Sequence, residues 1–333
     1  MRAAILTAFG QPLTITEIAR PLPGRGEVLV KTAGCGICRT DLHMIDGLAY
    51  KATLPHVLGH EPAGVIAEVG AGVTGFAPGD RVVPYLFKTC HHCRACEAGD
   101  DAQCSDLQGI LGVTMPGAFA EYFVAPADNL LPVPVDLLIE STGLAACAVV
   151  TSVRAVRRAG LESGQTAAVI GAGGIGTLVL QGLAARKVKA TAIDPSEASR
   201  DEALKSGAVR AIAPDAATMG ADFDRVFDLV GTAQSMGLAG KIIRRGGRIV
   251  VIGEEPEFPA IDSIAIAQRE LEIVGSRNGS RADAEEALRL MATGVLRPHV
   301  ARRVPLAEIN EALVALRRGD VHGRIVVTFG DTA

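Results

Sequence analysis

The stretch from Ala167 to Gly176, AAVIGAGGIG, decides the fold of this chain. The apolar residues before Gly171 read as a short buried strand, and the residues after Gly176 have the apolar spacing of a helix. A strand that turns through G-x-G-x-x-G into a helix binds the pyrophosphate of a dinucleotide. In that motif Gly171 permits the tight turn, Gly173 lets the phosphates approach the backbone, and Gly176 lets helix and strand pack closely.

An acidic residue refines this expectation. Asp194 follows the strand expected at residues 189–193, where a carboxylate accepts hydrogen bonds from the ribose hydroxyls and repels a 2′-phosphate. This position favours NAD over NADP, and an ordinary turn aspartate before Pro195 is the alternative. Arg200, six residues on, is the residue that could tip this balance, but within the next helix it is interpreted as a surface charge. The predicted cofactor site therefore consists of Gly171, Gly173, Gly174, Ile175, Gly176 and Asp194.

The pattern around this motif indicates an α/β domain. From about residue 145, strands alternate with helices, which implies parallel β-α-β units in a doubly wound Rossmann sheet. We expect helices at residues 145–159, 174–185 and 196–206, and strands at residues 167–170, 189–193, 225–229, 248–252 and 271–274.

The first third of the chain has a different pattern, with short β-like runs between glycine and proline turns. We expect strands at residues 3–6, 13–17, 27–33, 64–69, 80–84 and 118–125. Closely spaced strands of this kind indicate a compact β barrel or sandwich. Beyond residue 280 we expect helices at 282–293 and 306–317, and a final strand at 323–328 that can return to the first domain.

The composition restricts the function classes. The chain has 333 residues, enough for two domains, with 48% apolar residues and a net charge of −4. It has no tryptophan, three tyrosines and no block of lysine and arginine, so we expect no nucleic-acid-binding surface. No apolar run reaches the ~20 residues of a membrane span, and the N-terminus reads as a strand and not as a secretion signal. We therefore expect a soluble protein of a reducing compartment, the cytoplasm.

Four of the seven cysteines lie within residues 90–104, CHHCRACEAGDDAQC, and they are Cys90, Cys93, Cys96 and Cys104. Thiolates this close repel one another unless a cation neutralises them, and a tetrahedral Zn²⁺ with four sulfurs at about 2.3 Å is the usual solution. The spacing predicts a closed structural zinc site, with His91 and His92 left to solvent. A bacterial iron–sulfur run has a shorter last gap and a proline where Ser105 stands. An odd cysteine count without a secretion signal argues against disulfides.

The other three cysteines have histidines nearby in the sequence. Cys35 and Cys38 precede His43 and His60, and Cys147 lies near the end of the predicted first domain. Taken singly, each has an ordinary structural explanation, because buried cysteines behave as small hydrophobes. Together, and beside a dinucleotide fold, they indicate a catalytic zinc with three protein ligands and one open position.

Several motifs occur in a characteristic order. Gly36-Ile-Cys38-Arg-Thr40-Asp41-Leu-His43 comes first, followed by Gly59-His60-Glu61, the four-cysteine loop and the glycine motif. Over nearly its whole length the chain resembles the zinc-dependent alcohol dehydrogenases of the medium-chain dehydrogenase/reductase superfamily. The resemblance implies a Rossmann dinucleotide-binding domain at residues 149–279, inserted in a mainly β, GroES-like catalytic domain formed by residues 1–148 and 280–333.

For the matching positions, the resemblance implies a catalytic zinc held by Cys38, His60 and Cys147. The family usually has a glycine where Val149 stands, so the backbone after Cys147 can differ here. Polyol dehydrogenases of the superfamily often carry glutamate at the position of Cys147, and cysteine therefore favours simple alcohols.

Other matching positions would support the chemistry. Glu61 would lie behind the zinc or bind it transiently, and Asp41 would orient the metal-bound histidine. Thr40 would receive the proton that the alcohol releases by hydroxyl relay, the cofactor ribose would pass it on, and His43 would hand it to solvent, a role that suits histidine. A helix cap is the alternative role for Thr40. Cys35 matches no chemical role and is interpreted as a buried structural thiol.

The resemblance also implies contacts to the cofactor and substrate. Arg39 and Arg324 would approach the cofactor pyrophosphate. Leu48, Leu86 and Leu111 are candidates for an apolar substrate wall.

The predicted function is hydride transfer between a primary or secondary alcohol and NAD, with two zinc ions per subunit, one catalytic and one structural. An NADP-dependent carbonyl reductase or a polyol dehydrogenase of the same superfamily is the alternative, and a non-catalytic zinc- or nucleotide-binding sensor is the alternative from another class. We expect a small-molecule alcohol or carbonyl substrate, no nucleic-acid or membrane partner, and a homotetramer, with a dimer as the second choice.

Overall fold

The computed structural model describes residues 1–48, 50, 52–217, 222–255 and 262–330. The chain divides into two compact units. The first consists of Met1–Cys147, Ser280–Ala292 and His299–Ala333, and the second of Ala148–Gly279 and Thr293–Pro298. Residues 293–298, expected in the first domain, group with the second unit. There the side chain of Gln181 accepts a hydrogen bond from the Arg297 N–H at 2.7 Å and donates one to the Arg297 carbonyl at 3.1 Å.

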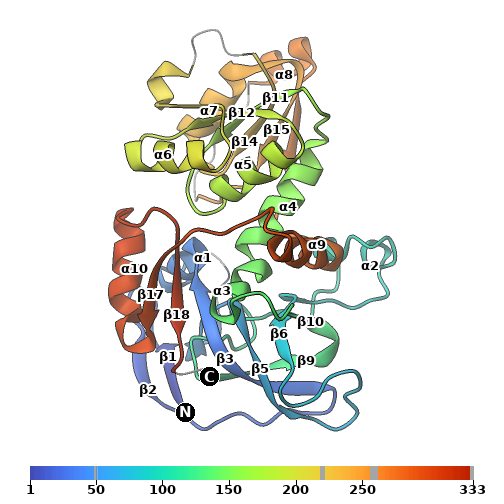
Figure 1. Cartoon of the computed structure of the whole chain (residues 1–333), viewed down its shortest axis with the longest axis vertical. Helices are drawn as coiled ribbons and strands as arrows, with labels where there is room; N and C mark the ends of the chain where they lie inside the picture. Colours follow the sequence, from blue (N-terminus) through green and yellow to red (C-terminus); the bar gives the residue numbers. More distant parts are fainter. Residues whose placement is uncertain (49, 51, 218–221, 256–261, 331–333) are drawn as a thin grey trace. The chain divides into compact units, whose positions relative to one another are not determined.

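The first unit is mainly β (Figure 1). Its strands are β1 (Arg2–Leu6), β2 (Thr14–Glu17), β3 (Glu27–Ile37), β4 (His56–Val57), β5 (Glu61–Val69), β6 (Arg81–Pro84), β7 (Phe87–Lys88), β8 (Gly109–Ile110), β9 (Tyr122–Pro126), β10 (Leu130–Pro132), β17 (Val300–Pro305) and β18 (Arg324–Thr328). Its helices are α1 (Arg39–Ile45), α2 (Arg94–Glu97), α3 (Ile139–Thr142), α9 (Arg281–Ala292) and α10 (Ile309–Arg318), with short 3₁₀ helices η1 (Asp101–Gln103), η2 (Ala127–Asn129), η3 (Gly143–Ala146) and η5 (Leu306–Glu308).

The main sheet of this unit has seven strands. Six follow the order β10-β6-β5-β3-β18-β17, and β9 also pairs with β3. Strand β18, from the end of the chain, pairs antiparallel with β3 and sets Val327 opposite Cys35, so the red strand lies beside the blue one in Figure 1. A smaller sheet has the order β2-β1-β4. The long central strand β3 is buried over most of its length, and its end leads directly into α1.

Two departures from the predicted elements bear on the site. The helix predicted at 145–159 is interrupted, because Cys147 has φ −133° and ψ −69° and α4 begins only at Ala148. The strand predicted at 118–125 begins only at Tyr122, because the preceding residues bond to β1 in the smaller sheet, with Ala4 N–H donating to the Phe119 carbonyl at 2.8 Å. The sequence pattern also missed α1 and β17.

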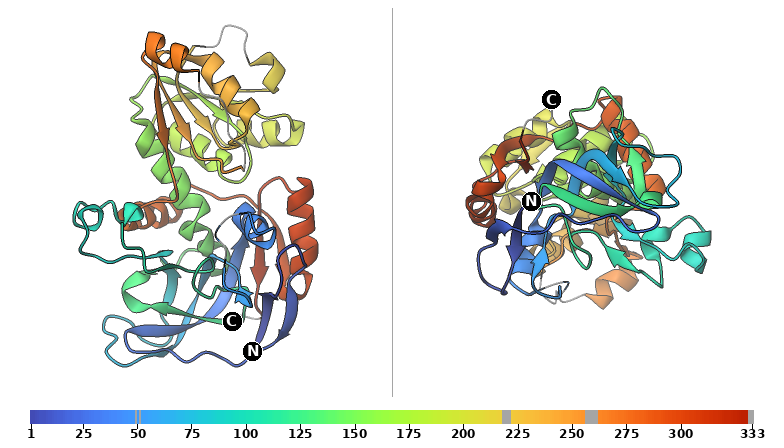
Figure 2. Two further views of the ribbon diagram at one scale, coloured as in Figure 1. Left: turned by 180° about the vertical axis from the view of Figure 1, so that it is seen from behind. Right: turned by 90° about the horizontal axis from the view of Figure 1, so that it is seen from below.

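The second unit is a parallel sheet with helices on its faces (Figures 1 and 2). Its six strands follow the order β13-β12-β11-β14-β15-β16. They are β11 (Thr166–Ile170), β12 (Lys189–Ile193), β13 (Arg210–Ile212), β14 (Phe223–Asp228), β15 (Ile243–Val251) and β16 (Glu272–Gly275). The helices are α4 (Ala148–Ala159), α5 (Gly176–Ala185), α6 (Glu197–Lys205), α7 (Ala233–Ile242) and α8 (Ser263–Arg269), with η4 at Pro214–Ala216.

Apolar side chains cover both faces of this sheet. Ala167 and Val169 of β11 pack with α4 and α5, whereas Ala168 and Ile170 pack with α7 on the opposite face. This alternation is the period-two pattern of a strand buried on both sides. The strand order reverses between β11 and β14, and in sheets of this type ligands bind beyond the carboxyl ends of the strands at that point. The glycine turn follows β11 at this edge.

Within the described residues, no single helix is both long and apolar enough to cross a membrane. The bent pair formed by Ile139–Ala146 and Ala148–Ala159 meets that criterion only jointly, by length and composition.

Candidate metal centres and dinucleotide turn

A buried cluster in the first unit brings together four predicted site residues. The ligand atoms of Cys38, His60, Glu61 and Cys147 all lie within 4.8 Å of one another. Cys38 is the residue that precedes α1, Glu61 begins β5 just after His60, and Cys147 follows η3. Two thiols and an imidazole are the donor set of a zinc site with an open fourth position. These residues therefore fit a zinc ion by the chemistry of their donor atoms.

Asp41 supports this cluster from the first turn of α1. Its Oδ1 lies 3.2 Å from Nδ1 of His60, and its Oδ2 accepts a hydrogen bond from the Cys38 N–H at 2.8 Å. Asp41 and His60 are both buried. Although burial opposes it, the Asp41 carboxylate raises the pKa of His60. An Nδ1–H that donates to Asp41 leaves Nε2 of His60 as the acceptor for a metal, which is the usual arrangement of a metal-bound histidine.

The two thiols of the buried cluster have opposite pKa shifts. Hydrogen bonding with Cys147, and then with His60, lowers the pKa of Cys38 against the effect of burial. The hydrogen bond with Cys38, together with burial, raises the pKa of Cys147. One thiolate therefore forms readily, whereas a second beside it requires another positive charge. A divalent cation would supply that charge.

Glu61 is paired with Arg324 at the start of β18. Both carboxylate oxygens lie 2.5 Å from Nη2 of Arg324, and both side chains are buried. Burial raises the pKa of the Glu61 carboxyl, although the charge of Arg324 opposes it. A Cβ atom at Gly36 would lie 2.1 Å from Glu61 Oε2, so a glycine on β3 leaves the space that this carboxylate fills. A contact between Arg324 and a cofactor pyrophosphate stays a prediction.

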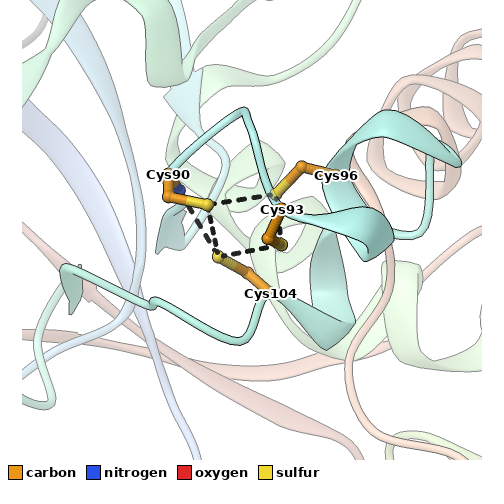
Figure 3. A group of neighbouring side chains, drawn as sticks. All are labelled: Cys90, Cys93, Cys96 and Cys104. Atoms are coloured by element: carbon orange, nitrogen blue, oxygen red, sulfur yellow. Dashed lines mark hydrogen bonds between the residues drawn. The ribbon is translucent and has the colours of Figure 1, made fainter.

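The four-cysteine loop forms a second cluster in the same unit, which we call the cysteine lobe (residues 90–104). All its cysteines are free thiols that point toward one another (Figure 3). The Sγ–Sγ distances are 3.5 Å for Cys93–Cys96, 3.6 Å for Cys104–Cys90, and 4.0 Å for both Cys90–Cys96 and Cys93–Cys104. Four sulfurs at 2.3 Å from a tetrahedral ion would be about 3.8 Å apart. The cysteine lobe therefore fits a single tetrahedral ion such as Zn²⁺, whereas a four-iron cluster places each thiolate on a different iron.

The other residues predicted for the chemistry lie on or beside α1. Arg39 is exposed at its first position, Thr40 Oγ1 lies 3.7 Å from Cys38 Sγ, and His43 is half-buried one turn later. The residue that caps α1 is Cys38, with Asp41 as its partner, so the alternative of a cap does not apply to Thr40.

The three leucines proposed for a substrate wall do not all lie together. Leu86 and Leu111 are buried, and the Leu111 N–H donates to the Leu86 carbonyl at 3.1 Å. Leu48 is instead 57% exposed on the segment after α1. The first two could form one wall, while Leu48 belongs to a different segment.

The glycine turn of the second unit has the backbone that its sequence predicts. Gly171 has φ +90°, a region that other residues rarely adopt. A Cβ atom at Gly176 would lie 2.0 Å from the Gly171 carbonyl oxygen, so α5 approaches the turn closely only with glycine there. A Cβ atom at Gly173 would meet nothing within 4 Å, which leaves open space in front of the turn. Asp194 follows β12, and its Oδ2 accepts a hydrogen bond from the Ala172 N–H within the turn at 2.8 Å.

At this edge of the sheet, the sequence analysis did not identify Asp228 and interpreted Arg200 only as a surface charge. Asp228, fully buried at the end of β14, accepts hydrogen bonds from the Val230 and Gly231 N–H groups and from the Ser235 hydroxyl. An acidic residue at the end of a parallel strand was the available signal. Arg200, interpreted as a surface charge, is half-buried and donates from Nη1 to the carbonyls of Asp194 and Pro195 at 2.9 and 2.8 Å.

Comparison with protein-family models gives two matches. A model described as an alcohol dehydrogenase GroES-like domain matches residues 24–135, and a model described as a zinc-binding dehydrogenase matches residues 174–293.

Similar proteins match over the full length of the chain. It is 36% identical to an alcohol dehydrogenase of Geobacillus stearothermophilus, with 98% of this chain and 99% of that protein covered. It is 33% identical to the D-arabinose 1-dehydrogenase (NADP(+)) of Saccharolobus solfataricus, with 98% and 97% covered. Among solved structures, the thermostable alcohol dehydrogenase of Pyrobaculum aerophilum has a TM-score of 0.93 at 30% identity, with 99% of both chains covered. The relatives thus differ in named substrate, and one of them is named for NADP(+).

Proposed function

The chain belongs to the zinc-type alcohol dehydrogenases of the medium-chain dehydrogenase/reductase superfamily, and we propose that it transfers a hydride between a simple alcohol and NAD. One observation carries the proposal: Cys38, His60 and Cys147 converge in a chain that also carries a dinucleotide turn. Neither feature alone would specify a dehydrogenase. A metal site without the turn fits a hydrolase equally well, and the turn without the metal site fits a zinc-free reductase.

The residues of the buried cluster would divide the work. Cys38, His60 and Cys147 would hold a catalytic zinc, and Asp41 would keep His60 in the tautomer that presents Nε2. When bound, Zn²⁺ supplies the Lewis acidity that makes a substrate hydroxyl acidic, and NAD supplies the hydride acceptor. Thr40 Oγ1, next to the Cys38 sulfur, would accept the hydroxyl proton while releasing its own, and the His43 imidazole would pass a proton to solvent.

The Glu61 carboxylate lies among the same donor atoms, and its charge is balanced by Arg324. We propose that this pair keeps Glu61 from occupying the substrate position of the metal. The pairing leaves transient coordination possible without making the carboxylate a permanent fourth ligand. Arg39 on α1 and Arg324 on β18 are the arginines that we propose for the cofactor pyrophosphate.

For the cofactor we propose NAD, because the Asp194 carboxylate lies beside the glycine turn. The second candidate is an NADP-dependent carbonyl reductase or a sugar or polyol dehydrogenase of the same family. The specific observation in its favour is the 33% identity to a D-arabinose dehydrogenase named for NADP(+). The cysteine at position 147, where polyol enzymes often have glutamate, supports simple alcohols instead.

We propose a second, structural zinc in the cysteine lobe and a homotetramer with a dimer as its building block. Strand β16 is the outer strand of the parallel sheet, and Ile273 on it is 37% exposed. A second copy could pair with this strand and extend the sheet. Seven free cysteines suit a reducing compartment, and we propose the cytoplasm.

The test is a substrate panel with the zinc-loaded enzyme. Primary, secondary, aromatic and cyclic alcohols, together with sugars and polyols, are offered with NAD and, separately, with NADP, and the reduced cofactor is followed by absorbance. We expect turnover of simple alcohols with NAD, and loss of turnover in enzyme stripped of zinc. An enzyme that reduces neither cofactor with any alcohol, and oxidises neither with the matching carbonyls, would contradict the proposal.

A further inference from the structure

The carboxylate of Asp194 occupies a small anion site built by the backbone. Its Oδ2 accepts a hydrogen bond from the Ala172 N–H at 2.8 Å, and its Oδ1 accepts one from the Ser196 N–H at 2.9 Å. Two backbone donors from different segments, the glycine turn and the start of α6, therefore converge on one negative charge. Without that charge, both N–H groups would lack this acceptor.

Arg200, a residue of α6, contacts the backbone at Asp194. Its Nη1 donates to the carbonyls of Asp194 and Pro195, so the guanidinium reaches back to the end of β12. Among the residues that the structure describes, Nε and Nη2 of Arg200 have no hydrogen-bond partner, and the side chain is only half-buried. These two donors are the fork that guanidinium groups use to bind a carboxylate or phosphate.

The other charges nearby do not neutralise Arg200. Glu197 and Asp201 are exposed on α6, and within the described part of the chain neither forms an ion pair with Arg200. The carboxylate of Asp194 is occupied by backbone donors, and only its main-chain carbonyl contacts the guanidinium. The positive charge is therefore available to a ligand at the end of β12.

We propose that Arg200 is a second cofactor-selectivity residue, which attracts the 2′-phosphate of NADP while Asp194 repels it. The inference rests on the proposed dinucleotide function of the glycine turn. A phosphate near the ribose hydroxyls would meet the negative charge of Asp194 and the unused donors of Arg200 together. Preference for NAD is then a difference between two opposing groups, and the enzyme uses NADP weakly instead of excluding it. Removing the Asp194 side chain alone would leave Arg200 and the two N–H groups as a phosphate site.

The experiment compares the zinc-loaded wild-type enzyme with Arg200→Gln, Arg200→Lys, Asp194→Ala and the double variant Asp194→Ala/Arg200→Gln. Dissociation constants for NAD and NADP are measured by calorimetry, together with zinc content and melting temperature. For Arg200→Gln we expect binding of NADP to weaken by about tenfold, the size of a lost charge-assisted contact, while binding of NAD changes by less than about threefold. Arg200→Lys keeps the charge and should lose only part of this contact.

In Asp194→Ala we expect tighter binding of NADP by about tenfold and weaker binding of NAD, and the double variant should lose the gain for NADP. A role of Arg200 only in bracing the turn would weaken both cofactors equally, and that result would overturn the inference. The inference also fails if the double variant binds NADP as tightly as Asp194→Ala. If Asp194→Ala does not fold, the Arg200→Gln comparison decides alone. A wild-type enzyme that binds neither cofactor would instead remove the proposed function and this inference with it.

Discussion

The two thiol clusters of the first unit are built in opposite ways. The cysteine lobe takes all its sulfurs from one short loop, and three of its four cysteines are partly exposed. The buried cluster takes its candidate ligands from three distant segments, at Cys38, His60 and Cys147, and surrounds them with Asp41 and the Glu61–Arg324 pair. A closed site needs only a loop of suitable spacing, whereas a reactive site needs neighbours that control the charge of its ligands.

The groups that control the thiols differ accordingly. In the cysteine lobe, backbone hydrogen bonds, first from Cys96, lower the pKa of Cys93 to about 5, so the loop itself stabilises a thiolate. In the buried cluster, side chains from other elements stabilise the thiolate, because Cys147 and His60 lower the pKa of Cys38. Local backbone can prepare a structural metal site, but the buried site depends on the tertiary fold.

The strongest test of this contrast is to remove a ligand of the buried cluster. Cys38→Ala and His60→Ala should each lower kcat/KM by roughly 10⁴-fold, because the Lewis acid that activates the hydroxyl contributes several kcal/mol. Zinc content should fall from two ions to one per chain, with the fold retained. Cys35→Ala is the matched control, since this buried thiol on β3 donates to the Gly36 carbonyl and is not one of the clustered metal-ligand candidates, and its activity should stay within about threefold. Full activity in either ligand variant would remove the metal from the mechanism.

The reciprocal test removes a ligand of the cysteine lobe. Cys93→Ser should lose the other zinc and lower the free energy of unfolding by about 5 kcal/mol, part of what a structural zinc contributes, or the melting temperature by about 10–20 °C. The kcat/KM of the protein that stays folded should change only a few-fold. His92→Ala, an exposed neighbour, should keep both zinc ions and the wild-type melting temperature. A loss of zinc in His92→Ala would instead make this histidine a ligand.

The Glu61–Arg324 pair tests whether the neighbours of the buried cluster work as a unit. Arg324→Met should lower the free energy of unfolding by about 3–5 kcal/mol, because it leaves the Glu61 carboxylate buried without its partner. The double variant Glu61→Gln/Arg324→Met should be less destabilised than the sum of its single variants. Denaturant unfolding of all four proteins gives this coupling, and purely additive losses would show that the two side chains act independently.

The smallest effect is expected at the far end of α1, the helix that begins beside Cys38. Arg317 on α10 holds the Asp46 carboxylate with two hydrogen bonds of 2.7 and 2.8 Å, and this lowers the pKa of Asp46. Because both side chains are partly exposed, Arg317→Gln should cost about 0.5–1 kcal/mol at pH 7.

The pH dependence of this pair follows from the sign of the shift. A carboxyl whose pKa is lower in the folded protein stabilises the fold fully above its unfolded pKa of about 3.9, and this contribution is lost as the pH falls through the lower pKa of the folded state. Unfolding of wild-type protein and Arg317→Gln, measured from pH 7 down to about 2, should therefore begin to converge below about pH 3.9 and coincide only below the folded pKa of Asp46. Arg318→Gln, the next residue of α10, is the control and should match the wild type throughout. A difference that persists at acid pH would point to packing and not to charge.

Much of the site could be predicted because its signals are local. The spacing of Gly171, Gly173 and Gly176 describes one turn, and the four cysteines of the lobe describe one loop. In both cases a few consecutive residues contain the whole geometric requirement. The structure places Gly171 at φ +90°, and the four sulfurs all lie within 4.8 Å of one another, as these requirements demand.

The features that were not predicted correctly depend on contacts between segments that are distant in the sequence. The helical pattern continues through Cys147, and only packing in the folded chain interrupts the helix there. Residue spacing likewise does not show that Arg200 donates to the Asp194 carbonyl at the end of β12. It also does not show that Asp228 accepts a hydrogen bond from the Val230 N–H in the loop after β14. Each is a contact between side chain and backbone that exists only once the strands and helices are in place.

By itself, the amino-acid order determined the two kinds of domain, the glycine turn and the close spacing of the four thiols in the cysteine lobe, because each depends on neighbours along the chain. Only the tertiary structure decided which charged groups face the buried cluster and the end of β12. Asp41 is held against His60, Arg324 against Glu61, and Arg200 against the end of β12 by elements far apart in sequence. Electrostatic energy depends on distance in space, and distance in space is what folding sets.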